Sequence, residues 1–296
     1  MGTLRAATRG SPLARWQAEH VAGLLRAVDP DLTVELVVVD TQGDRQLDVP
    51  IWELGGKGVF AKEVQAAVLD GRADFAVHSA KDLPAVSLPG LVIAAVPERG
   101  DPRDALVGST LADLPDGAEV ATGSLRRQVE LARHRPDLRF VSLRGNMQTR
   151  LAKAADHDAI VVAAAAFDRL GLADHLAERL PIETVLPQVG QAALAVESRE
   201  DDIEVSGALV AVEHGPTRRC VDAERAFLAE LGGDCFLPAG AHATIDAPGE
   251  MTLRAFLASP DGETMVRTTG RGHEAAVGTQ AAIELRERGG AALGLT

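Results

Sequence analysis

Two short segments of the sequence carry side chains that could do covalent chemistry. In the segment His78-Ser79-Ala80-Lys81-Asp82-Leu83-Pro84, a carboxylate follows directly on a cation. In the segment Gly232-Gly233-Asp234-Cys235-Phe236-Leu237-Pro238, a thiol follows two glycines that end a helix, so it should be reachable. Each segment also has a structural explanation, because Asp82 could stabilise a turn beside Lys81 and Cys235 could be an ordinary loop cysteine. Lys81, Asp82 and Cys235 are therefore candidate site residues.

Arginines gather between these two segments, where strands are expected to lead into helices. Arg126 and Arg127 follow Ser124, the expected helix cap, so two cations occupy a first turn where the helix dipole disfavours them. A bound anion that met both the guanidinium groups and the helix N-terminus would explain this placement. Similar junctions elsewhere carry Arg9, Arg144 and Arg150. Solvated surface arginines are the alternative, but the repetition favours an anion-binding surface.

Composition limits the classes of protein to consider. The 296 residues are 46% hydrophobic and 3% aromatic, which favours α/β layers over an aromatic platform for nucleic acid. The formal net charge of −13 also argues against a nucleic-acid partner, although a local arginine cluster can still bind a small anion. No segment has the apolar run of a signal peptide or membrane span, so we expect a cytoplasmic protein without a membrane partner. The two cysteines form no CxxC pair, and no metal site is expected.

Hydrophobic patterning predicts the elements that must position these side chains. Short apolar strands alternate with amphipathic helices, a pattern typical of doubly wound α/β sheets. Ligands bind at the carboxyl ends of strands in such sheets, and the Asp82 loop and the arginine junctions fall there. The expected strands are 4–7, 33–39, 74–77, 119–121, 139–141 and 159–166, and helices are expected from Pro12 with Ser11 as cap, from Ala61, near Ser124 and near Asn146.

The last part of the chain predicts a small α+β domain. Cys220 shares one face of a predicted helix with Ala223 and Phe227, so we expect it to be a core residue and not a reactive thiol. The expected elements are a helix over 217–231, antiparallel strands over 252–257 and 263–269, and a covering helix over 273–288.

The chain resembles the porphobilinogen deaminase family, also called hydroxymethylbilane synthases, over almost its full length. Any one of the shared motifs is weak, but their ordered succession is highly specific to this family. The matching segments are Ala7–Ala14, Gly55–Gly58, Val77–Pro84, Asp101–Ala105, Ser124–Gln128, Leu143–Asn146, Arg169–Leu172, Val189–Gln191 and the Cys235 loop.

This resemblance implies a transferase that joins four porphobilinogen molecules head to tail and releases ammonia each time. The product would be hydroxymethylbilane, used in tetrapyrrole and hence haem-type biosynthesis. A dipyrromethane cofactor would be attached to Cys235 through a thioether and act as the primer. Asp82 would be the catalytic carboxylate that stabilises positive charge as ammonia leaves, and Lys81 would bind a substrate carboxylate beside it.

The resemblance also implies roles for the cationic side chains. Every pyrrole unit carries an acetate and a propionate, which suit forked guanidinium groups. The cofactor-binding residues would be Lys81, Asp82, Ser124, Arg126, Arg127 and Arg144, in addition to Cys235, and the substrate-binding residues would be Arg9, Ser11, Arg150, Arg169 and Gln191.

The implied fold has two periplasmic-binding-protein-like doubly wound domains around a cleft, with a small α+β third domain. The expected boundaries are 1–97 with 194–212 for the first domain, 98–193 for the second and 213–296 for the third. A monomer without an obligate protein partner is expected.

Three positions depart from the usual family pattern. Asp234 stands beside the cofactor cysteine, Ala192 follows Val-Gly-Gln where glycine is common, and Ala85-Val86 lacks an acidic residue. None of them removes a residue assigned to chemistry. Two alternatives are a non-catalytic anionic-solute-binding or effector-sensing protein of the same two-domain fold, and a hydrolase that uses Cys235 and His78. A stable adduct on Cys235 would separate the main interpretation from both.

Overall fold

The predicted alternation of strands and helices is present in the computed structural model, which describes residues 2–41, 58, 61–232, 238–247, 249–289 and 292–293. The segments that hold Gly55–Lys57 and Asp234–Cys235 lie outside the described residues. The chain divides into two compact units, Met1–Gly100 with Ala192–Arg218 and Asp101–Gln191 with Arg219–Thr296. The expected boundaries of three domains stay a prediction.

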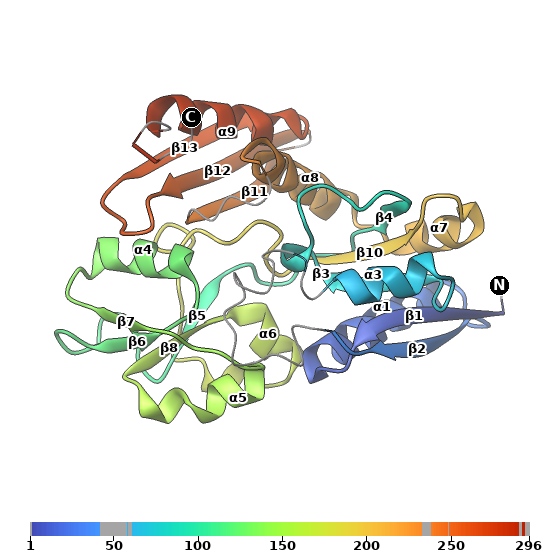
Figure 1. The fold of residues 1–296 in the computed structure, drawn as a ribbon, viewed down its shortest axis with the longest axis horizontal. Helices are drawn as coiled ribbons and strands as arrows, with labels where there is room; N and C mark the ends of the chain where they lie inside the picture. The colour runs from blue at the N-terminus through green and yellow to red at the C-terminus, as the bar shows by residue number, and fades with distance from the viewer. Residues whose placement is uncertain are drawn as a thin grey trace. The chain divides into compact units, whose positions relative to one another are not determined.

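In the described part of the first unit, five strands form a sheet in the order β2-β1-β3-β10-β4 (Figure 1). β1 runs parallel to β2 and to β3, whereas β10 is antiparallel to both of its neighbours. The strands are β1 (Thr3–Arg9), β2 (Thr33–Val39), β3 (Phe75–Ser79), β4 (Leu91–Ala95) and β10 (Leu194–Arg199), and the helices are α1 (Pro12–Val28), α3 (Lys62–Leu69), α7 (Ile203–Leu209) and the short turns η1 (Ala80–Asp82) and η4 (Val210–Val212).

Helices cover both faces of this sheet because its apolar residues point alternately to either side. Ala6 of β1 belongs to the core that includes Val21 of α1. The next residue, Ala7, belongs to the separate core that includes Val64 of α3. The doubly wound arrangement predicted from the sequence is therefore confirmed for this unit.

The second unit contains another sheet of the same kind, with the described strands in the order β7-β6-β8-β5-β9. β6 is parallel to β7 and β8, and β5 is antiparallel to β8 and β9. Val120 of β6 packs with Leu131 of α4, whereas Ala121 packs with Phe167 of α6, so both faces are again covered. The elements are β5 (Asp104–Val107), β6 (Glu119–Ala121), α4 (Leu125–His134), β7 (Arg139–Val141), α5 (Met147–Ala152), η2 (Ala154–Asp156), β8 (Ala159–Ala163), α6 (Ala164–Arg169), η3 (Ala173–His175) and β9 (Glu178–Arg179).

One predicted element was too long. The sequence predicts a strand over 159–166, but β8 ends at Ala163 and α6 begins at Ala164. Every residue from Ala159 to Phe167 is buried, so the apolar run has no periodicity that could mark the change. Its alanines have the highest helix propensity, and this decides the conformation once β8 reaches the sheet edge.

The second unit also contains the small antiparallel sheet β11-β12-β13 with a covering helix α9. The sequence predicted β12, β13 and the covering helix, but it did not predict β11. Helices α8 and α9 approach closely at Gly278, where an added Cβ would lie 1.8 Å from the carbonyl oxygen of Ala223. Cys220 is buried in α8, which confirms its expected place in the core. The bounds are α8 (Gly215–Glu230), β11 (Ala239–Ala247), β12 (Glu250–Ala258), β13 (Met265–Gly272) and α9 (Ala276–Gly289). Among the helices described, none is long and apolar enough to cross a membrane.

Candidate functional site

The loop that carries Lys81 and Asp82 continues directly from the buried strand β3. Its first residues form the turn η1, in which the Leu83 N–H donates to the carbonyl oxygen of Ala80 at 3.3 Å. The Ala80 N–H donates to the carbonyl oxygen of Ala193 at 3.0 Å, which fastens the turn to the start of β10. Ala80 and Leu83 are buried, whereas Lys81 and Asp82 are half-buried. The fold therefore presents the two charged side chains from a fixed base.

Arg9 and Ser11 lie at the same sheet edge as this loop. β1 ends at Arg9 and runs parallel to the neighbouring β3, so both strands deliver their next residues to one edge. Ser11 caps α1 by accepting a hydrogen bond from the Ala14 N–H at 3.3 Å, and Pro12 occupies the first helical position, as predicted.

Buried polar side chains surround the strand β3, which leads into this loop. His78 Nε2 of β3 lies 3.1 Å from Glu197 Oε2 of β10, and Gln65 of α3 donates to the same oxygen at 2.9 Å. Gln17 of α1 donates to Ser79 Oγ at 2.8 Å. The hydrogen bonds of Gln65 and Gln17 tie the strand that carries the loop to α3 and α1, whereas His78 Nε2 lies close to Glu197 without a hydrogen bond to any described residue. His78 is only 6% exposed, which weighs against a hydrolase that would use it as an accessible base.

In the second unit, β6, β7 and β8 lead to arginines at one sheet edge. The strands are parallel neighbours, and each is followed by a helix. Ser124 caps α4 as predicted, and Asn146 caps α5 by accepting from the Thr149 N–H at 2.9 Å. The candidate residues that follow these strands are Ser124, Arg126, Arg127, Arg144, Arg150 and Arg169.

Arg126 and Arg127 are buried and share the carboxylate of Asp104. Arg126 Nη2 donates to Asp104 Oδ2 at 2.7 Å. Arg127 donates to Asp104 Oδ1 through Nε at 3.0 Å and through Nη2 at 2.7 Å. Gln191, another candidate, donates to the same oxygen at 3.1 Å. Five of the six guanidinium nitrogen atoms of the two arginines therefore already donate to acceptors within the protein, which the sequence did not indicate.

Asp104 is the residue of this buried cluster that the sequence analysis did not single out. It begins β5 and pairs across the antiparallel ladder with Ala163 of β8, which places it at the edge where the arginines gather. A signal was present, because Asp104 lies in the family motif Asp101–Ala105. No local pattern, however, joins it to arginines more than twenty residues away.

Opposing electrostatic effects act on this buried cluster. Burial would raise the pKa of the Asp104 carboxyl, but the charges and hydrogen bonds of Arg126 and Arg127 outweigh burial and hold that pKa below its ordinary value. Burial lowers the pKa of the Arg126 guanidinium, and Asp104 opposes this effect. Two guanidiniums share one carboxylate, so the cluster keeps an excess positive charge. Arg126 Nε is buried and has no acceptor among the described residues.

The other arginines of this edge are half-buried. Arg150 Nε donates to the carbonyl oxygen of Gly145 at 2.9 Å. Gly145 has φ +115°, and an added Cβ would lie 2.6 Å from the Thr149 side chain, so this turn requires glycine. Burial lowers the pKa of Arg169 to about 10, and the nearby charge of Asp168 offsets only part of that effect. A desolvated cation of this kind is stabilised when a carboxylate binds.

Comparison with known proteins decides the family. Residues 4–207 match the family model described as "Porphobilinogen deaminase, dipyromethane cofactor binding domain", and residues 218–287 match "Porphobilinogen deaminase, C-terminal domain". The chain belongs to the porphobilinogen deaminase family. It is accordingly an enzyme, and its family uses a dipyrromethane cofactor.

Relatives of this family match along nearly the whole chain. The porphobilinogen deaminase of Brevibacillus brevis is 45% identical over 295 residues, which cover 98% of this chain and 96% of the relative. That of Syntrophotalea carbinolica is 47% identical over 294 residues, covering 97% of this chain and 93% of the relative.

Similar solved structures are much more distant. The periplasmic aliphatic sulphonate binding protein SsuA from Escherichia coli has a TM-score of 0.37 and 16% identity, covering 77% of this chain and 70% of that protein. YhfZ from Shigella flexneri has a TM-score of 0.37 and 18% identity, covering 77% of this chain and 90% of that protein. Scores this low support no statement about function.

The described residues fit the dipyrromethane group in one testable respect. Its acetate and propionate groups need N–H donors, and the buried Arg126 Nε is such a donor within a cluster of excess positive charge. Cys235 lies outside the described residues, so its surroundings are not part of this test. The other cysteine, Cys220, is only 7% exposed and is a poor candidate for carrying a bulky adduct.

Proposed function

We propose that this enzyme condenses four porphobilinogen molecules head to tail, releasing ammonia at each step, to form hydroxymethylbilane for tetrapyrrole biosynthesis. The single observation that carries the proposal is the match to both family models, over residues 4–207 and 218–287. Two groups of residues support it. One is the Lys81–Asp82 pair at an edge of the first sheet, and the other is the set of arginines at an edge of the second.

Asp82 is assigned to the chemical step. Loss of ammonia leaves a positive charge on the substrate, and a carboxylate already fixed in place stabilises that charge without reorganising. The same oxygen atoms accept a hydrogen bond from the pyrrole N–H and move protons as the new bond forms. The rigid base formed by Ala80, Leu83 and Ala193 supports this role. Lys81 binds a carboxylate of the substrate beside the reacting carbon.

Cys235 is assigned as the attachment point of the cofactor. When bound, the dipyrromethane supplies the pyrrole carbon to which the first substrate unit is joined. The buried position of Cys220 supports Cys235 as the thiol that carries it. Lys81, Asp82, Ser124, Arg126, Arg127 and Arg144 are proposed to hold the cofactor.

The remaining cations are assigned to the substrate and the growing chain. Each added unit brings an acetate and a propionate, so negative charge accumulates as the product lengthens. The desolvated guanidinium of Arg169 supports a site that gains stability when a carboxylate arrives. Arg9, Ser11, Arg150, Arg169 and Gln191 are proposed to bind these groups.

We further propose that the enzyme acts as a monomer in the cytoplasm. The formal net charge of −13 supports separate chains in solution, because like-charged copies repel one another. Native mass spectrometry tests the monomer, and cell fractionation tests the location.

Intact-protein mass spectrometry combined with an ammonia-release assay tests the main proposal. The purified enzyme should carry two linked pyrrole units on Cys235 and none on Cys220, and it should release ammonia from porphobilinogen. Cys235→Ser should abolish activity, whereas the control Cys220→Ala should retain most of it. An unmodified chain that binds porphobilinogen without releasing ammonia would instead support a solute-binding protein.

A further inference from the structure

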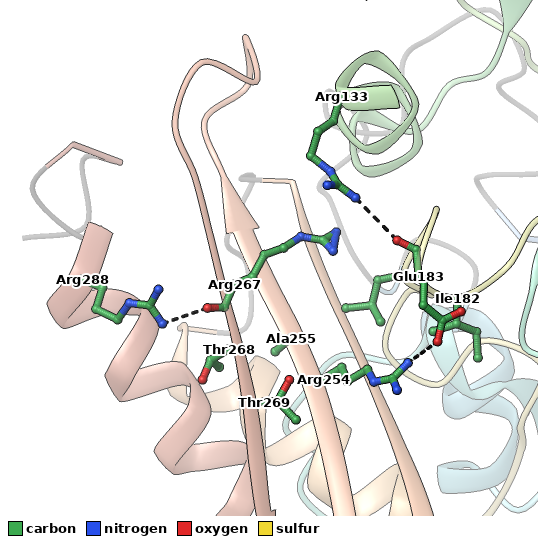
Figure 2. A pocket seen from close by; sticks show the side chains of 10 residues that line it. Arg133, Ile182, Glu183, Arg254, Ala255, Arg267, Thr268, Thr269 and Arg288 are labelled. Carbon is green, nitrogen blue, oxygen red and sulfur yellow. Dashed lines mark hydrogen bonds and ion pairs between the residues drawn. The ribbon is translucent and has the colours of Figure 1, made fainter. Parts of the chain in front are cut away.

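A second cationic site lies at the opposite end of α4 from Arg126 and Arg127. There a cavity of about 540 Å³ opens between α4, the segment 182–186 and the strands β12 and β13 (Figure 2). All of these elements belong to the second unit. The volume lies within the range of about 300–1,000 Å³ that is usual for small-molecule sites.

The lining of this cavity contains more arginines than carboxylates. Its described lining includes one carboxylate, that of Glu183, and four arginines, which are Arg133, Arg254, Arg267 and Arg288. Glu130 and Glu284 bond Arg267 and Arg288 and reduce the excess positive charge without removing it.

Arg133 contributes a cation that no described carboxylate neutralises. Its Nη2 lies 2.8 Å from His134 Nε2 and 3.5 Å from the carbonyl oxygen of Glu183. Burial lowers the pKa of His134 and the charges of Arg133 and Arg267 lower it further, whereas the charge of Glu130 opposes this shift. Arg133 and Arg267 thus both place positive charge at this end of α4, and Glu130 offsets part of it.

Arg267 is held in place by two contacts, and one of its guanidinium nitrogen atoms has no acceptor among the described residues. Its guanidinium carbon lies 5.3 Å from the ring centroid of Phe256, a favourable cation–π distance, and Nη2 bonds Glu130. Its Nε atom is buried and has no acceptor among the described residues. Arg254 is half exposed and reaches Glu183 through Nη1 at 2.5 Å, so its other nitrogen atoms can meet a ligand.

We propose that this cavity binds a small organic anion that carries two or more carboxylate or phosphate groups on a compact apolar body. Separated guanidinium groups match separated anionic groups through charge-assisted hydrogen bonds. Ile182, Leu186 and Ala255 supply an apolar part of the wall. The site uses none of the residues assigned to porphobilinogen or to dipyrromethane, and it does not depend on the proposed function.

Isothermal titration calorimetry on the holoenzyme tests this site, with citrate as the carboxylate probe, pyrophosphate as the phosphate probe and acetate as a monoanion. At least one polyanion should bind once per chain, and acetate should not. Arg254→Gln and Arg133→Gln should each weaken that binding about tenfold, since each removes a charge-assisted contact. The matched control is Arg286→Gln, which removes an exposed arginine that pairs with Glu230 outside the cavity and should leave binding within about twofold.

A variant that is expected to strengthen binding makes the test independent of folding defects, because a folding defect would weaken binding. Glu183→Gln removes the lining carboxylate and releases Arg254, so it should tighten binding by about threefold or more. Turnover of porphobilinogen should stay near normal in the Arg254 and Glu183 variants, which separates this site from the catalytic one. Absence of polyanion binding, or binding that Arg133→Gln and Arg254→Gln leave unchanged, would overturn the proposal.

Discussion

The carboxylate of Asp104 and the guanidinium of Arg126 lie 2.7 Å apart, and both side chains are almost entirely buried. The pair joins the first residue of β5 to the first turn of α4. Arg127 completes the arrangement from the next position of the helix. The cluster therefore has a structural role in addition to any contact with a ligand.

Asp104→Asn should strongly destabilise the protein. The substitution leaves two buried guanidiniums without a countercharge, and breaking a buried ion pair in this way costs about 3–5 kcal/mol. Urea unfolding of the apoenzyme and holoenzyme would measure the loss. The control Asp137→Asn removes a surface partner of Arg135 and should cost much less. Equal losses in the two variants would contradict the assigned role of burial.

The same pair makes stability depend on pH in a defined direction. The pKa of Asp104 is lower in the folded state than its ordinary value of 3.8. Its stabilising contribution is therefore fully present above the unfolded pKa and is lost as pH falls through the lower, folded pKa. Unfolding free energies measured from pH 6 down to pH 3 should decline less steeply in Asp104→Asn than in the wild type.

Ala192→Gly should stabilise the protein. Among the described residues, Ala192 is the non-glycine residue with a positive φ, at 67°. An alanine in the left-handed conformation destabilises the folded state by about 1–2 kcal/mol. Glycine removes this cost, but its greater flexibility stabilises the unfolded state by about 0.5–1 kcal/mol. The expected net gain is about 0.5–1 kcal/mol in unfolding free energy. The control Ala193→Gly, at the buried neighbour without a positive φ, should instead destabilise.

Local sequence signals predicted the elements and the caps but not the long-range pairs. The strand 33–39 was predicted at the bounds that β2 has, and Ser11 and Ser124 cap helices as expected, because these features depend on neighbouring residues. The Asp104 cluster depends on the antiparallel register of β5 and β8, which no local pattern specifies. The boundary at Ala164 was missed because buried alanines have no period.

Arg150→Leu should stall chain elongation at a countable stage. Arg150 lies at the sheet edge reached by β7, where it is proposed to bind carboxylates of the growing product. Its loss removes a charge-assisted contact that matters more as negative charge accumulates. Mass spectrometry of enzyme incubated with porphobilinogen would show which bound chain accumulates.

The matched control for that experiment is Arg139→Leu. Arg139 begins β7, so it lies at the other end of the strand, and its side chain is exposed. Its Nε donates to the carbonyl oxygen of Gly117 at 2.9 Å. A normal distribution of bound chains is expected for this variant, and the same stall in both would mean that general loss of charge is responsible.

Asp82→Asn should reduce turnover far more than substrate binding. Asparagine keeps the size and some hydrogen bonding of aspartate but removes the charge that stabilises the transition state as ammonia leaves. Asp82→Glu should retain partial activity, since a displacement on the order of 1 Å costs roughly a hundredfold. Both variants should be supplied with preformed bilane so that cofactor assembly does not limit them. Single-turnover measurements of ammonia release would decide the role: near-normal chemistry in Asp82→Asn would make Asp82 a turn residue of η1 and place the catalytic group elsewhere.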